Sequence, residues 1–304
     1  MIFQAIDAVN RIEPALLPGG RGSVACVWTT NPKYLVFGTS GIRPERVVQF
    51  GPEDELRQVH AILTTLEPLL TGIIPAPIAC EPWDADTFVQ IQTGLDGAPW
   101  FILQQRFRTA ASWESLEQEA LAVLDKFRAA VRSVPEWTSL VVPELELRRQ
   151  LQLCGRHGVT MSPDTAAGVD RLADGLRSLG SIPGSAQHGD YALNNVLRAD
   201  DGSMRVMDFE EFGLTRMPLH DEVGLALSMR ALGSAPMLPL GLEDHIRRAV
   251  KGTIQERPEL GPYVRALAVH HMLWRVNRSH GDRRARARQW LLSLVDQLAT
   301  APPE

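Results

Sequence analysis

The spacing of apolar residues changes once along this chain, near residue 110, and no other feature of the sequence restricts its fold as much. Before the change, short apolar runs that favour strands follow one another, with turns rich in Gly and Pro between them. The pair Asp96–Gly97 lies between the last two runs and is typical of a hairpin turn. We therefore expect three strands, one helix and a two-stranded hairpin, over residues 24–30, 34–37, 46–50, 52–70, 87–92 and 100–105 in that order.

After the change, apolar residues recur at intervals of three and four, which is the period of an amphipathic helix. Such patterns predict helices over residues 112–130, 144–157, 165–179 and most of 219–300. Residues 183–213 break the series, because loop residues surround two short apolar runs there. The sequence thus predicts an α+β protein in which a strand-rich part, residues 1–104, is followed by a mainly helical part, residues 105–304.

The composition is that of a folded, soluble protein. Of 304 residues, 44% are apolar and 22% are charged, which excludes disordered and low-complexity classes. The net charge of -5 argues against a nucleic-acid partner, because phosphate contacts usually need a basic surface. Cys26, Cys80 and Cys154 stand too far apart for a disulfide framework or a structural zinc site. The pair His270–His271 has no further ligands at metal spacing, which favours packing.

We expect a cytoplasmic protein with no membrane partner. The N-terminal segment lacks the basic region and the long apolar region of a signal peptide. The best apolar stretch, residues 61–79, contains Glu67 and three prolines, so it is unsuited to span a bilayer.

The segment 187–197, with the sequence QHGDYALNNVL, carries the residues on which a functional prediction rests. Phosphoryl transfer requires a carboxylate that orients or deprotonates the attacking hydroxyl, and oxygen ligands for Mg²⁺. Asp190 and Asn195 have the five-residue offset of a kinase catalytic loop, and Asp208 follows after one strand-like run. We expect Asp190 to be the catalytic carboxylate and Asn195 and Asp208 to bind Mg²⁺. Asn194, one residue earlier, is the alternative to Asn195.

These residues resemble the aminoglycoside phosphotransferase and choline kinase family, in which the loop reads HGDxxxxN and the metal motif reads DFE or DWE. Here Asp208 is followed by Phe209 and Glu210, and the segment 218–221, PLHD, resembles the start of the family's next helix. The resemblance implies a two-lobed, protein-kinase-like fold, with a small antiparallel-sheet N-lobe, a mainly helical C-lobe and a cleft that binds a nucleotide. It also implies that His188 shapes the loop and is not a base.

The resemblance further implies a kinase that moves the γ-phosphoryl group of ATP or GTP, with Mg²⁺, to a hydroxyl of a small molecule. The acceptor would be an antibiotic such as an aminoglycoside, as in antibiotic resistance enzymes, or a sugar or amino-alcohol metabolite. The protein would be a monomer or a homodimer. Candidates for contacting the acceptor are Glu210, Glu211, Asp221 and Trp274. The alternative is a pseudokinase, which binds a nucleotide or a partner without transfer.

Two segments are candidates for contacting the nucleotide. The run GGRGS precedes the first predicted strand, so Gly20, Gly22 and Ser23 are candidates to cover the phosphates through backbone N–H groups. Such a run is also typical of a plain turn. In the family, the hinge after the last N-lobe strand contacts the adenine, which implies this role for Gln105 and Phe107.

The phosphate-binding lysine of kinases is missing from its expected place. Gln49 occupies that place, and Val59 occupies the position of the glutamate that usually pairs with the lysine. Glu55 would serve only under a shifted alignment. The two losses are consistent with each other, because an unpaired buried charge is costly.

Three interpretations of this loss stay open. Gln49 contacts the phosphates weakly while Mg²⁺ carries most of the charge, or the site is inactive, or a cation from a neighbouring strand substitutes. The candidate cations are Lys33, Arg43 and Arg46. Arg46 has the wrong strand parity relative to Gln49, which argues against it.

The charge of the chain is unevenly distributed. Residues 1–104 hold 6 basic and 11 acidic side chains, whereas residues 105–304 hold 25 of each. The part expected to bind a polyanionic nucleotide therefore carries the whole net charge of -5, and Lys33 is its only lysine. The helical part is not acidic overall, so net charge gives no support for a cationic acceptor.

Overall fold

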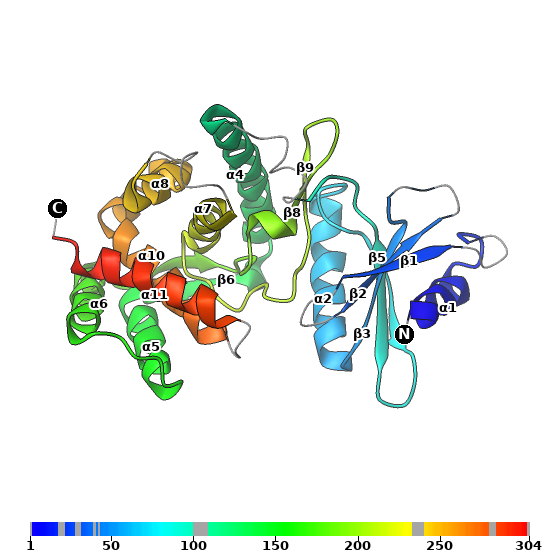
Figure 1. Ribbon diagram of the computed structural model, residues 1–304, viewed down its shortest axis with the longest axis horizontal. Helices are drawn as coiled ribbons and strands as arrows, with labels where there is room; N and C mark the ends of the chain where they lie inside the picture. Colours follow the sequence, from blue (N-terminus) through cyan, green and yellow to red (C-terminus); the bar gives the residue numbers. More distant parts are fainter. Residues whose placement is uncertain are drawn as a thin grey trace. The chain divides into compact units, whose positions relative to one another are not determined.

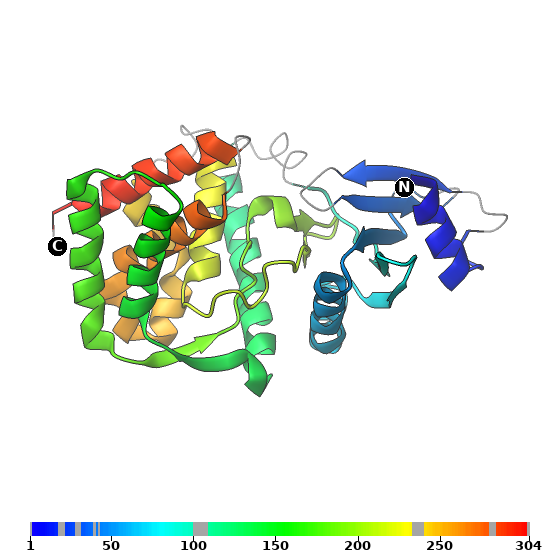
Figure 2. The same cartoon turned by 90° about the horizontal axis from the view of Figure 1, so that it is seen from below.

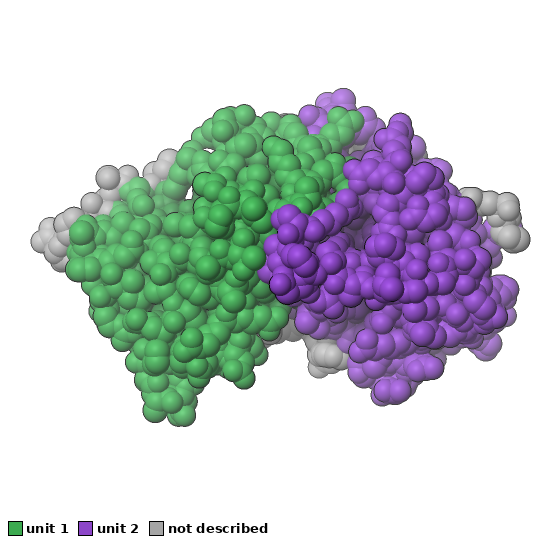
Figure 3. All heavy atoms as spheres, turned by 180° about the vertical axis from the view of Figure 1, so that it is seen from behind, with its two compact units in different colours: residues 1–108, 118–130, 193–211 green, residues 109–117, 131–192, 212–304 purple. Residues whose placement is uncertain are grey.

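The computed structural model of the protein describes residues 2–17, 22–27, 32–38, 41, 43–99, 109–232, 240–279 and 284–302. The chain divides into two compact units, which Figure 3 shows in different colours. Unit 1 consists of Met1–Arg108, Gln118–Ala130 and Leu193–Glu211, and unit 2 of Thr109–Glu117, Val131–Ala192 and Phe212–Glu304. The boundary predicted between residues 104 and 105 falls outside the described residues.

Unit 1 is built on a five-stranded antiparallel sheet. The strands are β1 (Ser23–Val27), β2 (Lys33–Phe37), β3 (Arg46–Gly51), β4 (Pro77–Pro82) and β5 (Phe88–Thr93), in the order β1-β2-β3-β5-β4 across the sheet. Before and between them lie α1 (Ile2–Ile12), α2 (Glu53–Leu66) and the 3-10 turn η2 (Glu67–Leu69). The small antiparallel sheet predicted from the sequence is thus confirmed.

The two faces of this sheet differ in polarity. Tyr34, Val36 and Val48 are buried in one core with apolar residues of α1. Because side chains alternate along a strand, Lys33 and Gln49 project from the opposite face. Figure 1 shows α1 and α2 on different sides of the sheet. The polar face of the sheet is therefore the one that α1 does not cover.

Helix α1 and strand β4 are absent from the sequence prediction, which expected one helix among the first hundred residues. The buried side of α1 consists of Ala5, Ala8 and Val9. Its apolar residues recur at intervals of three and four, so the helical pattern is present in the sequence and the prediction missed it. Strand β4 begins at Pro77 and ends at Pro82. It lies at the edge of the sheet, where proline is tolerated because fewer ladder hydrogen bonds are needed.

The predicted hairpin of residues 87–92 with 100–105 is wrong. Strand β5 has β3 on one side and β4 on the other, so it has no edge left for another strand. After Asp96–Gly97, Ala98 pairs with Arg198, and Ala98 N donates to Arg198 O at 2.7 Å, whereas residues 100–105 lie outside the described residues. Gly97 has a φ of 132°, and a Cβ atom there would lie 2.9 Å from Leu197 Cβ, so this close approach requires glycine.

Unit 2 is mainly helical. Its helices are α5 (Pro143–Arg156), α6 (Pro163–Leu176), α7 (His220–Leu232), α8 (Leu242–Ala249), α9 (Lys251–Glu256), α10 (Val264–Arg278) and α11 (Ala285–Thr300), while α4 (Ala110–Arg132) contributes residues to both units. Figure 2 shows α5 and α6 (green) beside the C-terminal helices (orange and red). The helical part predicted after residue 110 is confirmed. Within the described ranges, every helix is too short or too polar to cross a membrane.

Short strands and 3-10 turns connect these helices. Strand β6 (Thr138–Val141) pairs with β7 (Ile182–Ser185) in unit 2, and β8 (Val196–Arg198) pairs with β9 (Met204–Val206) in unit 1. The 3-10 turns are η3 (Pro135–Trp137), η4 (Arg177–Leu179), η5 (Leu193–Asn195) and η7 (Pro258–Tyr263). Strands β8 and β9 are the two short apolar runs that interrupt the helical pattern in the sequence.

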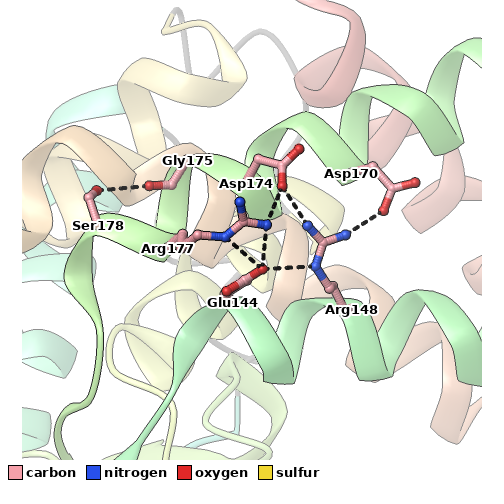
Figure 4. Close-up of polar contacts among 7 residues, drawn as sticks. All are labelled: Glu144, Arg148, Asp170, Asp174, Gly175, Arg177 and Ser178. Atoms are coloured by element: carbon pink, nitrogen blue, oxygen red, sulfur yellow. Dashed lines mark hydrogen bonds and ion pairs between the residues drawn. The ribbon is translucent and has the colours of Figure 1, made fainter.

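A network of ion pairs joins α5 to α6 (Figure 4). Arg148 contacts Asp170 and Asp174 of α6 at 3.0 and 2.7 Å. Glu144 accepts hydrogen bonds from Arg177 and Arg148, which lower the pKa of its carboxyl group. Arginine suits this role because its planar fork binds several carboxylate oxygens at once. The network lies at the surface, so each pair stabilises unit 2 only slightly.

The contact between α6 and α11 requires a glycine at position 168, where a Cβ atom would lie 2.3 Å from the backbone oxygen of Ala299. Gly168→Ala is therefore expected to lower the free energy of unfolding by about 1–3 kcal/mol, the range for overpacked sites. The control is Gly175→Ala in the same helix, where nothing lies within 4 Å of the added Cβ. It is expected to raise stability by up to about 1 kcal/mol. Urea unfolding measures both changes, and equal stability of the two variants would contradict this packing.

Candidate active site

The residues predicted to bind Mg²⁺ stand at the two ends of the β8–β9 hairpin in unit 1. Asn195 is the last residue of η5, directly before β8, and Asp208 follows shortly after β9. Met207 N donates to Asn195 O at 3.0 Å, which holds the ends of the hairpin together. The amide oxygen of Asn195 accepts a hydrogen bond from Asn194 Nδ2 at 3.1 Å. The hairpin therefore brings Asn195 next to the residue that precedes Asp208.

The turn that carries Asp208 and Glu210 is anchored in the core of unit 1. Asp208 has a φ of 71°, in the left-handed region that Asp adopts more readily than most residues. The next side chain, Phe209, is buried, and its ring centroid lies 6.1 Å from that of Phe127 in α4. Burial of Phe209 fixes the backbone between the two carboxylates.

A lysine from the sheet joins these carboxylates. Lys33 Nζ lies 2.9 Å from Asp208 Oδ1 and 3.2 Å from Glu210 Oε1. Burial by itself lowers the pKa of Lys33, but the two carboxylates outweigh it and hold this pKa above its ordinary value of 10.5. The ammonium group is therefore charged at neutral pH. Gln49 Nε2 donates to the same Glu210 Oε1 atom at 3.0 Å.

The structure places the other nucleotide candidates as follows. Gly22 lies directly before β1, where a Cβ atom would be 2.9 Å from Phe37 O, and Ser23 pairs with Phe37 in the β1–β2 ladder. Close packing of two strands thus accounts for glycine at position 22. Gly20, Gln105 and Phe107 lie outside the described residues.

In unit 2, Asp221 of α7 fixes the loop that carries Asp190. The backbone N–H groups of His188 and Gly189 donate to the two carboxylate oxygens of Asp221, at 2.7 and 3.0 Å. Asp221 is only 1% exposed. Of the acceptor candidates, Asp221 therefore holds the loop backbone with both of its oxygens, and it does not lie on an open surface.

Asp190 itself contacts a cation of unit 2. Its Oδ1 atom lies 3.0 Å from Nη1 of Arg275 in α10. The sequence did not predict this contact, because nothing in the spacing of residues so far apart indicates that they meet. The ion pair restricts the direction in which the carboxylate of Asp190 points.

Three histidines are buried beside this loop. His220 Nε2 lies 3.3 Å from Gly189 O, and its ring centroid lies 4.3 Å from that of His271 and 4.7 Å from that of Trp274. Burial lowers the pKa of His220 and of His271 well below the ordinary value, and lowers the pKa of His270 to about 3. The three rings are neutral at physiological pH. His270 and His271 lie in the core, in line with the packing role that the sequence favoured.

Trp274 also lines a pocket of unit 2 with a volume of about 400 Å³. Glu146 and Arg149 of α5 and Arg278 of α10 supply its charged groups. Asn277, which is 5% exposed, donates through Nδ2 to Gln150, while its Oδ1 atom has no hydrogen-bond partner within the part of the chain that the structure describes. The pocket thus combines the aromatic ring of Trp274, the guanidinium donors of Arg149 and Arg278, and the unpaired acceptor atom Oδ1 of Asn277.

The remaining acceptor candidates belong to unit 1. Glu210 contacts Lys33 and Gln49, as described above, and Glu211 follows it as the last residue of the segment Leu193–Glu211. Neither residue is among those that line the pocket of unit 2. Of the residues predicted to contact the acceptor molecule, Trp274 lines that pocket.

Comparison with known proteins gives one match to a family and many to solved structures. The model of the phosphotransferase enzyme family matches residues 29–244. No curated protein sequence matches the chain. The family match covers the Asp190 loop, the Asp208 turn and Lys33.

Among the solved structures, the chain is similar to a thermostable mutant of aminoglycoside phosphotransferase APH(4)-Ia in a ternary complex with ADP and hygromycin B, with 13% identity, a TM-score of 0.62 and 96% of each chain covered. A glucosamine kinase in complex with glucosamine, ADP and inorganic phosphate has 15% identity and a TM-score of 0.57, with 97% of this chain and 81% of that chain covered. A choline kinase from Cryptosporidium parvum has 12% identity and a TM-score of 0.61, with coverages of 97% and 94%. These likenesses show the fold, and the predicted kinase-like architecture is confirmed.

Proposed function

The chain belongs to the phosphotransferase enzyme family, and from this premise we propose that it is a small-molecule kinase, which transfers the γ-phosphoryl group of ATP to a hydroxyl of its acceptor. Asp190 orients and deprotonates that hydroxyl, and Asn195 and Asp208 bind Mg²⁺. The observation that carries the proposal is the fixed loop: the carboxylate of Asp221 holds the N–H groups of His188 and Gly189, next to Asp190. A catalytic base needs such a fixed position, since catalysis depends on its geometry.

The residues of unit 1 fit a magnesium ion by their chemistry. Asp208 and Asn195 offer the carboxylate and amide oxygens that Mg²⁺ prefers. No group of three or more His, Cys, Asp or Glu side chains at metal distance occurs among the described residues. A site with two protein ligands suits Mg²⁺, which usually takes its other ligands from phosphates and water. When bound, Mg²⁺ neutralises charge on the phosphates.

The proposed donor is ATP. The aminoglycoside phosphotransferase and the glucosamine kinase to which the chain is similar were each solved with ADP. The proposed contacts of Gln105 and Phe107 with adenine follow from the family's hinge. Those of Gly20, Gly22 and Ser23 with the phosphates follow from the Gly-rich run before β1, whose backbone N–H groups can bind anions. Comparing the affinities for MgATP and MgGTP by calorimetry tests the choice of donor.

The pocket lined by Trp274 supports an acceptor of about the size of a sugar. Its lining contains two guanidinium groups, those of Arg149 and Arg278, and one carboxylate group, that of Glu146. A polycationic aminoglycoside needs several carboxylates, so this charge favours a sugar or amino-alcohol metabolite with few positive charges. Asp221 is an acidic candidate for contacting the substrate, but both of its carboxylate oxygens accept hydrogen bonds from the backbone of the loop. Antibiotic resistance is therefore the less favoured role.

An acceptor panel tests this proposal. We expect kcat/KM to be higher for neutral sugars and singly charged amino sugars or amino alcohols than for aminoglycosides with several amines. A preference for aminoglycosides would overturn the acceptor class but not the reaction. Binding of ATP without transfer to any acceptor would favour the pseudokinase.

Arg275 is expected to act as a positioning residue for Asp190, since its guanidinium group contacts Asp190 Oδ1 at 3.0 Å. Arg275→Gln should lower kcat by roughly tenfold and leave the KM for ATP unchanged, because a misdirected base weakens proton transfer. Arg278→Gln in the same helix removes an equal charge from the pocket lining and should instead raise the KM for the acceptor. Steady-state kinetics with both substrates varied separates the effect on kcat from the effects on KM. An unchanged kcat in Arg275→Gln would contradict the positioning role.

A further inference from the structure

We propose that Lys33, on β2, is the cation that binds the nucleotide phosphates, in place of the lysine that kinases carry on the next strand. This inference rests on the proposed function, because it assumes that unit 1 binds ATP. Of the three interpretations of the missing lysine that the sequence left open, it selects the one in which a cation from a neighbouring strand takes the place of that lysine. All of the contacts that support this role lie within unit 1.

The first support is the register of the sheet. Lys33 of β2 and Gln49 of β3 are directly opposite each other in the antiparallel ladder. Directly opposite residues project from the same face, with Cβ atoms about 5 Å apart. Lys33 therefore projects from the same face of the sheet as residue 49, from the neighbouring strand.

The second support is that the two side chains end at the same atom. Lys33 Nζ lies 3.2 Å and Gln49 Nε2 lies 3.0 Å from Glu210 Oε1. The longer side chain of Lys33 thus crosses the distance between the strands and brings its charge to the place that the side chain of residue 49 reaches. It also brings Nζ within 2.9 Å of Asp208 Oδ1. Asp208 would hold Mg²⁺ near the nucleotide phosphates, so a cation next to its carboxylate is suitably placed to contact them.

The third support is that the other two candidate cations are engaged elsewhere. Arg46 forms an ion pair with Glu13 after α1, on the opposite face of the sheet, as its strand parity predicted. Arg43 contacts Asp96 and Asp200 at 3.0 and 2.9 Å. Lys33 is the one of the three that contacts Asp208 and Glu210.

The fourth support is a polar row across this face. Gln90 of β5 is directly opposite Gln49, so Lys33, Gln49 and Gln90 form a row over three strands. Gln90 is 2% exposed, and its Nε2 atom has no hydrogen-bond partner among the residues that the structure describes. Buried polar atoms are nearly always paired in native proteins, so an unpaired donor in this row points to a ligand with acceptor oxygens.

Binding of nucleotides to Lys33→Gln tests the proposal. Calorimetry with MgATP should give an affinity that is lower by roughly 10- to 100-fold than that of the wild type, the range that one charge-assisted hydrogen bond supplies. The affinity for adenosine, which lacks phosphates, should be unchanged. Arg46→Gln, which removes the same charge from the other face of the sheet, is the matched control and should bind MgATP like the wild type.

The exchanged variant, Lys33→Gln with Gln49→Lys, separates phosphate binding from a structural role. It returns one lysine to the same face and should recover most of the lost affinity for MgATP. Thermal unfolding of each variant confirms that it is folded at the temperature of the titration. Wild-type affinity in Lys33→Gln, or a folded exchanged variant without recovery, would overturn the role of Lys33 and leave the proposed function intact. A wild-type protein that binds no MgATP would overturn both.

Discussion

Replacing Asp190 by Asn is expected to lower kcat by roughly 10²- to 10⁴-fold, the contribution of a positioned general base. The amide has nearly the shape of the carboxylate but does not accept the proton of the attacking hydroxyl. The loop should keep its conformation, because it is held by Asp221 through the backbone of His188 and Gly189. The affinity for ATP should therefore stay near that of the wild type.

The matched control is Asp164→Asn, which makes the same change at an exposed position in the first turn of α6. It should leave kcat unchanged. Single-turnover transfer from radiolabelled ATP measures the chemical step in both variants. If Asp190→Asn transferred phosphate at the wild-type rate, Asp190 would not be the base, and its ion pair with Arg275 would have only a structural meaning.

Mild acid is expected to unfold unit 2, because three buried histidines must stay neutral in the folded state. Burial lowers the pKa of His270 from 6.5 to about 3 and lowers those of His220 and His271 in the same direction, with the charge of Arg275 adding to the effect on both. In the unfolded chain these rings take up protons below about pH 6.5. The stability that they contribute is therefore complete above pH 6.5 and is lost as the pH falls toward 3.

The size of this effect follows from proton linkage. Each ring lowers the free energy of unfolding by about 1.4 kcal/mol per pH unit below its unfolded pKa. The three rings together therefore lower it by about 6 kcal/mol between pH 7.5 and pH 5. That is a large part of the stability of a typical domain, about 5–15 kcal/mol. Urea unfolding at several pH values measures the loss. His270→Gln should reduce it by about one third. A loss that is the same in the wild type and in His270→Gln would contradict this assignment.

The sequence predicts the parts of the fold that repeat a simple pattern. The helical period after residue 110 and the order β1-β2-β3-α2 are of this kind. The prediction misses α1, although its apolar residues recur at helical intervals, and β4, where prolines mark both ends. For β4 the edge position in the sheet decides the structure, and no local pattern indicates it.

The candidate site divides in the same way. The roles proposed for Asp190, Asn195 and Asp208 follow from spacing, because a catalytic loop and a metal turn are local in the chain. The role proposed for Lys33 needs the structure, since the strand register and the ion pairs of Arg43 and Arg46 distinguish the three cations that the sequence offers. The contact of Arg275 with Asp190 depends on the packing of α10 in unit 2, which no local pattern indicates.

Mass spectrometry of the acceptor after incubation with MgATP tests the central claim most directly. With the wild-type protein and a panel of sugars and amino alcohols, we predict that at least one acceptor gains a single phosphoryl group while ATP is converted to ADP. With Asp190→Asn, the same acceptor should gain almost none in the same time. Phosphorylated acceptor in equal amounts from both proteins, or none from the wild type with any hydroxylated small molecule, would contradict the account.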